Sequence, residues 1–100
     1  MTFYSKKDYK FLFFQRGAHR LNKYDAILQH KKTKKIVIVS FGGIRPNGIP
    51  YTQYKDKALG LYSHYDNYDE KKRENYLKRH IIDINKPFSP SWFSRVFLWN

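Results

Sequence analysis

The first half of the chain contains three short apolar segments separated by polar residues. Tyr9–Phe14 is rich in aromatic residues, Lys23–His30 mixes apolar and polar positions, and Lys35–Phe41 includes four β-branched residues in succession. Segments of this length and composition are typical of β-strands. Because Lys31–Lys34 is a polar connection, the last two segments predict a hairpin with a lysine-rich tip. Ile36–Val39 is apolar at every position, so we expect both faces of this strand to be covered.

The second half of the chain has the spacing of helices. A turn-rich loop after Gly42-Gly43 leads to a short predicted helix at Lys55–Tyr62. A longer helix is predicted from Tyr68 to about Ile81, because Asn67 can act as its N-cap with Glu70 three residues later. Acidic residues then stand in its first turn and basic residues in its last, as the helix dipole favours.

The last segment, Trp92–Asn100, is almost wholly apolar and follows a proline-rich break with serines that can cap a helix. Its large side chains fall on two neighbouring helical stripes. We expect Phe93 and Phe97 to pack against the apolar strand. Trp92 and Trp99 would then remain as anchors for another protein, since tryptophan is enriched at binding hot spots.

Taken together, the pattern predicts an α+β fold, with a small antiparallel sheet followed by two or three short helices. At 100 residues the chain is expected to form a single small basic domain, 1–100. Residues 1–43 would be mainly β, 44–66 rich in loops and 67–100 mainly helical.

The charge is strongly positive and unevenly spread. Lys and Arg total 20 against 8 Asp and Glu, which gives a net charge of +12, and residues 1–57 contribute +10 of it. Such a field attracts polyanions: nucleic acid, anionic lipid or acidic protein surfaces. The aromatic content of 19% would suit a single-strand binder, but an AT-rich genome would also favour Phe, Tyr and Lys codons.

Two groups of residues are candidates for binding. The candidates for polyanion binding are Lys31, Lys32, Lys34, Lys35, Arg73 and Arg79. The candidates for binding a protein partner are Tyr76, His80, Trp92, Arg95 and Trp99. The polyanion-binding candidates also have plainer interpretations: the lysines form a solvated turn, and Arg73 and Arg79 pair with Asp69, Asp83 or the C-terminal segment.

Several kinds of chemistry are disfavoured by the sequence. There is no cysteine, which excludes disulfides, thiolate metal sites and cysteine nucleophiles. The four histidines are too widely spaced for a helical metal site, and neither Gly-x-Ser-x-Gly nor a phosphate-loop motif occurs. We therefore expect no enzyme activity, no metal and no cofactor. No apolar run is long enough to span a bilayer, although contact with a membrane surface stays a weaker alternative.

The order of motifs from Phe41 onward resembles a known family. The motifs are Phe41-Gly42-Gly43, Tyr51–Asp56, Tyr62–Asp66, Lys72–His80, Trp92–Arg95 and Leu98-Trp99-Asn100. They are similar to those of small, basic, uncharacterised proteins of nucleocytoplasmic large DNA viruses. The resemblance covers about sixty residues and supplies no function residue by residue.

This resemblance implies a protein of a large DNA virus with an AT-rich genome. We expect the protein to be located in the virion, and in the host cytoplasm during assembly. We expect a non-enzymatic structural component, such as a minor capsid or cement protein that binds larger capsid proteins. The alternative is a protein that binds nucleic acid without sequence preference and accompanies the viral genome.

Overall fold

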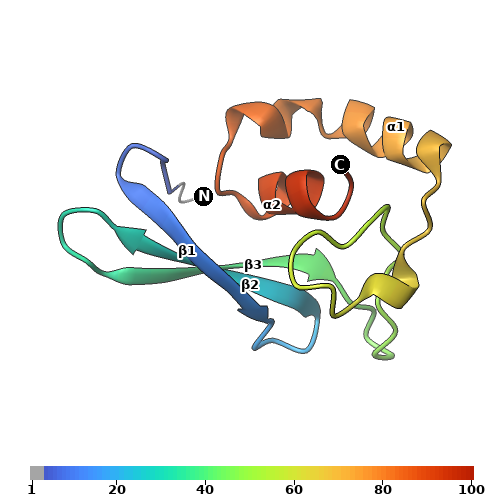
Figure 1. The fold of residues 1–100 in the computed structure, drawn as a ribbon, viewed down its shortest axis with the longest axis horizontal. Coiled ribbons are helices and arrows are strands. Elements are labelled where there is room, and N and C mark those ends of the chain that lie inside the picture. Colours follow the sequence, from blue (N-terminus) through green and yellow to red (C-terminus); the bar gives the residue numbers. More distant parts are fainter. Residues whose placement is uncertain (1–3) are drawn as a thin grey trace.

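The computed structural model describes residues 4–100, so the first three residues of the predicted domain lie outside it. Strands β1 (Tyr9–Arg16), β2 (Asn22–His30) and β3 (Ile36–Gly43) form an antiparallel sheet in the order β1-β2-β3. Helices α1 (Glu70–Arg79) and α2 (Pro90–Phe97) follow (Figure 1). The predicted α+β class, with a lysine-tipped hairpin before short helices, is confirmed.

Helix α2 covers one face of the sheet. Ser89 caps it by accepting a hydrogen bond from the Trp92 amide at 3.2 Å. Phe93 is 1% exposed and stacks on Phe41 of β3, with ring centroids 5.3 Å apart. The predicted packing of Phe93 on the apolar strand is therefore confirmed. Phe97 instead contacts strand β1, where its ring meets Phe14 edge-on at 4.8 Å.

The opposite face of the sheet stays open, which contradicts the prediction that both faces of Ile36–Val39 are covered. The register aligns Phe13, Ile27 and Ile38 across the three strands, and Phe13 and Ile38 are 51% and 55% exposed. The physical reason is that both helices lie on the same side of the sheet (Figure 1). Alternate side chains of β3 therefore face the core or solvent. We call Phe13, Ile27 and Ile38 the open apolar row.

The short helix expected at Lys55–Tyr62 is absent. The amide of Ala58 donates to the carboxylate of Asp56 at 2.9 Å, and the amide of Leu61 donates to the hydroxyl of Tyr24 at 3.0 Å. These bonds satisfy the donors that a helix would have used. A single 3-10 turn, Ser63–Tyr65, follows instead.

Buried side-chain hydrogen bonds hold this loop between β3 and α1. Tyr24 donates to Asp56 at 2.5 Å, and burial together with this bond raises the pKa of the Tyr24 hydroxyl. Gln53 donates to Asp66 at 2.7 Å, and the Asp66 carboxylate also accepts the Asp56 amide at 2.9 Å. The loop is thereby fixed against the sheet without regular secondary structure.

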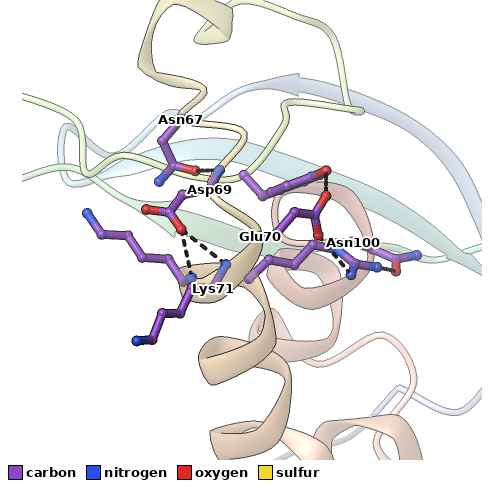
Figure 2. A network of polar contacts seen from close by, with 8 residues as sticks. Asn67, Asp69, Glu70, Lys71 and Asn100 are labelled. Atoms are coloured by element: carbon purple, nitrogen blue, oxygen red, sulfur yellow. Dashed lines mark hydrogen bonds and ion pairs between the residues drawn. The ribbon is translucent and has the colours of Figure 1, made fainter.

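Helix α1 begins later than predicted because its N-cap is Asp69 and not Asn67. The Asp69 carboxylate accepts the amides of Lys71 and Lys72, both at 3.1 Å (Figure 2). Asn67 makes a local turn by accepting the Asp69 amide at 2.9 Å, and Tyr68 between them has a φ of 50°. The left-handed conformation of Tyr68 separates the Asn67 turn from the Asp69 N-cap, so the helix starts at Glu70.

Candidate functional site

The fold exposes its cations and withdraws many of its acids. Sixteen of the twenty Lys and Arg side chains are exposed, whereas three of the eight Asp and Glu side chains are. The exposed acids are Asp8, Glu70 and Glu74. The surface is therefore more uniformly positive than the net charge of the sequence indicates.

The acids that leave the surface take part in internal hydrogen bonds. Burial alone would raise the pKa of Asp25, but hydrogen bonds from Ser40, Gln15 and the Ala18 amide hold it below its usual value. Asp83 is buried and lies 3.1 Å from the His80 ring nitrogen. These carboxylates neutralise little of the outer surface, because their charge is used inside the fold.

Seven exposed lysines gather at the hairpin end of the molecule. The main-chain amide of Lys31 donates to the Asp8 carbonyl at 2.8 Å, and its ammonium donates to the Lys6 carbonyl at 2.9 Å. The N-terminal turn is thereby joined to the hairpin tip. The resulting group, which we call the basic end, is Lys6, Lys7, Lys10, Lys31, Lys32, Lys34 and Lys35. Sequence reasoning found the four lysines of the tip but not the three that the turn and β1 add.

The hairpin tip itself is an ordered turn. The Nδ1 atom of His30 accepts the amides of Lys32 and Thr33, both at 3.2 Å, and Lys34 has a left-handed φ of 63°. These hydrogen bonds fix the main chain of the turn. The lysine side chains are therefore attached to an ordered turn and not to a flexible loop.

A second candidate site is a hollow of about 340 Å³ between α1, the end of β3 and the C-terminal segment, which we call the cleft. Its walls include Lys23, Gly42, Tyr76, Arg79, Ser94 and Trp99. In Figure 1 the hairpin tip lies at the left end of the long axis, whereas α1 and the end of β3 lie toward the right. The cleft and the basic end are therefore separate features.

A buried lysine stands in the wall of the cleft. Lys23 is 1% exposed, and its ammonium donates to the Tyr51 carbonyl at 2.7 Å and to Gln53 Oε1 at 2.5 Å. Burial lowers the pKa of Lys23 to about 8, although Asp56 and Asp66 oppose the shift. Sequence reasoning missed this residue, because a lysine at the start of a strand is usually solvated.

The glycine pair explains how Lys23 fits. Gly42 has a φ of 76°, and a Cβ atom there would lie 3.0 Å from the Lys23 Cβ. A Cβ on Gly43 would lie 2.9 Å from the Tyr51 ring. The pair was interpreted from sequence as the end of a strand, but its role is to let two side chains approach the main chain closely.

Three aromatic rings form a column beside the cleft. Tyr76 lies between His80 and Trp99, with centroid distances of 4.1 Å and 4.5 Å and nearly parallel planes. Burial raises the pKa of Tyr76 to about 12. The structure thus brings together three of the predicted partner-binding residues, with Arg79 on the same wall of the cleft.

Arg73 and Arg95, two of the other predicted site residues, are used within the fold. Arg73 lies 3.7 Å from the Glu70 carboxylate and 3.4 Å from the Asn100 amide oxygen, in the network of Figure 2. Arg95 donates to the Leu77 carbonyl at 2.9 Å and so fastens the end of α1. For Arg73, the plainer interpretation of an internal contact fits the geometry.

The two tryptophans are partly buried in the fold, and their role as anchors for another protein stays a prediction. Trp99 is half-buried in the aromatic column. Trp92 is half-buried against Phe88 and Phe93, with the Lys6 ammonium 4.7 Å from its ring centre. Both rings pack against the buried core of the molecule.

Two further observations concern metal ions and membranes. Within residues 4–100, no three His, Asp or Glu side chains are grouped so that they could hold a metal ion. Over the same residues, no helix has the length and apolar character needed to cross a membrane. Comparison of the chain with protein-family models, curated proteins and solved structures found no match.

Proposed function

We propose that this protein is a non-enzymatic binding protein of the virion of a large DNA virus, and that it binds nucleic acid without sequence preference. The viral setting rests on the sequence resemblance. Of the two roles that the sequence leaves open, the nucleic-acid-binding one is better supported by the geometry.

The observation that carries the proposal is the basic end. Seven exposed lysines from two distant segments share one end of the molecule, with Asp8 the one acid of the N-terminal turn beside them. Lysine is a flexible point charge that contacts phosphates but does not read bases with a fixed geometry. Binding driven by such contacts releases counterions and does not depend on sequence.

Fluorescence anisotropy on several duplexes and single strands, from low to physiological salt, tests this function. We expect similar affinities for all sequences and a steep, linear fall of log affinity with log salt concentration. Tight binding of one sequence that persists at high salt would contradict the proposal, and so would the absence of binding at low salt.

A minor capsid or cement role is the second candidate, and the open apolar row favours it. Phe13 and Ile38 are exposed beside Ile27, and apolar side chains gathered on one face often mark a protein interface. Mass spectrometry of purified virions, before and after the shell is stripped from the core, distinguishes the two roles. Loss of the protein with the shell would support the cement role, whereas retention with the genome would support nucleic-acid binding.

A further inference from the structure

We propose that the cleft is a binding site for one nucleoside phosphate, with the phosphate between Lys23 and Arg79 and the base against Trp99. The inference rests on the proposed function, because it assigns to the same protein a specific place for one nucleotide unit. It adds a built site to the diffuse attraction of the basic end.

The first argument is a cation without a partner. Arg79 is exposed, and within residues 4–100 its guanidinium forms no hydrogen bond or ion pair. It lines both the cleft and an adjoining hollow formed with Lys72, Asn75 and Trp99. The planar guanidinium suits a phosphate because it can donate two parallel hydrogen bonds.

The second argument is the incomplete neutralisation of Lys23. Two of its three ammonium donors bind the neutral oxygens of Tyr51 and Gln53, and the third has no acceptor within residues 4–100. Its acidic neighbours, Asp56 and Asp66, accept hydrogen bonds from other groups and form no direct ion pair with it. A phosphate in the cleft would compensate a buried charge that the protein itself compensates only at a distance.

The third argument is the shape and aromatic character of the site. A hollow of about 340 Å³ is within the range of small-molecule sites. Gly42 lines the cleft, and its missing side chain lets Lys23 pack closely against the main chain there, since a Cβ atom would lie 3.0 Å from the Lys23 Cβ. Trp99 borders both hollows, and its stacking on Tyr76 holds the indole in one orientation. A rigid aromatic face beside two cations fits a base joined to a phosphate.

Matched pairs of substitutions on α1 test the site. Lys72→Gln with Arg79→Gln removes two charges that line the hollows, and Lys71→Gln with Lys78→Gln removes two exposed charges from another face of the same helix. Titration calorimetry with a nucleoside monophosphate, the nucleoside alone and inorganic phosphate gives the affinities. We expect the first pair to weaken binding of the monophosphate by about tenfold and the second pair by less than about twofold. The nucleoside and inorganic phosphate should each bind more weakly than the monophosphate.

A fluorescence measurement gives an independent readout of the base. The substitution Trp92→Phe leaves Trp99 as the single tryptophan. Its emission should be quenched by the nucleoside monophosphate and not by inorganic phosphate. Absence of quenching, with unchanged calorimetric affinity, would overturn the placement of the base against Trp99.

Single-stranded oligonucleotides separate failure of the cleft from failure of the proposed function. If both pairs of variants lose strand affinity equally and the monophosphate does not bind, the cleft proposal is wrong and the nucleic-acid role stands. If the monophosphate binds but no strand binds at low salt, the proposed function is wrong and the cleft is a site for free nucleotides.

Discussion

The two ends of the molecule present positive charge in opposite ways. At the basic end, lysines such as Lys32 and Lys35 are exposed and close in sequence. In the cleft, Lys23 is buried among residues that come from the sheet, the long loop and the C-terminal segment. The basic end gives a strong positive electrostatic field, but its charges have no fixed positions. The cleft has few charges, and their positions are fixed. The two proposals therefore assign diffuse attraction and selective recognition to separate places in the fold.

This difference explains what the sequence can predict. The hairpin tip was predictable, because its lysines lie between two clear strand patterns within one local segment. Lys23 was not, because its burial depends on Gly42, Tyr51 and Gln53, which are 19 to 30 residues away in the sequence. Local patterns report propensity and charge, but a site assembled by tertiary contacts leaves no such local pattern.

The fold shows the same division. The strands and the packing of Phe93 followed from their apolar patterns. The apolar pattern did not predict that one side of β3 is uncovered. An unbroken apolar run does not show whether the rest of the chain can cover both faces of the strand. The absence of a helix before Ser63 was also not predictable from the pattern. The main-chain amides of this segment are bound by the side chains of Asp56 and Tyr24.

The largest expected effect comes from removing the packing that holds the helices on the sheet. Phe93→Ala should lower the free energy of unfolding by about 3–5 kcal/mol, because a fully buried ring leaves a cavity. The matched control is Phe13→Ala on the open apolar row, where half of the side chain is already in solvent. Its cost should be below about 1 kcal/mol in denaturant unfolding. Equal losses would show that the open row is covered and that the two faces were assigned wrongly.

The next largest effect is a pH dependence of stability that is caused by the titration of Lys23. Its pKa is about 8 in the fold and 10.5 when solvated, so between these values the unfolded chain binds more protons than the folded one. The free energy of unfolding should therefore rise with pH over this window, by on the order of 2 kcal/mol since the cleft admits some solvent. Lys23→Met should abolish the rise.

Tyr76 opposes this trend at higher pH. Its pKa is raised from 10.0 to about 12, so the unfolded chain loses the phenolic proton first and stability should fall above pH 10. Denaturant unfolding from pH 7 to 11 measures both effects. A steady decline over the whole range in the unsubstituted protein would contradict the buried position of Lys23.

A smaller effect is expected from the aromatic column. Trp99→Ala should cost about 1–2 kcal/mol, because the half-buried indole loses its stacking on Tyr76. Trp99→Phe retains an aromatic ring and should recover most of this loss. Thermal unfolding of both variants measures the difference, and equal destabilisation by Ala and Phe would show that the stack contributes nothing.

The most direct test of the central claim compares two variants with the same net charge. Replacing Lys31, Lys32, Lys34 and Lys35 with Ser weakens the basic end, and replacing Lys55, Lys57, Lys71 and Lys78 with Ser removes four exposed lysines elsewhere. Each set should change stability by no more than about 0.5 kcal/mol per site. The salt dependence of duplex binding is then measured by anisotropy for both variants and the parent protein.

If the basic end contacts the phosphates, the hairpin variant should lose about one unit of the log–log salt slope for each contact removed, and its affinity at low salt should fall much further than that of the control. Equal loss of slope and affinity in the two variants would contradict the account, because it would show that net charge, and not the arrangement of lysines at the hairpin end, is what the nucleic acid recognises.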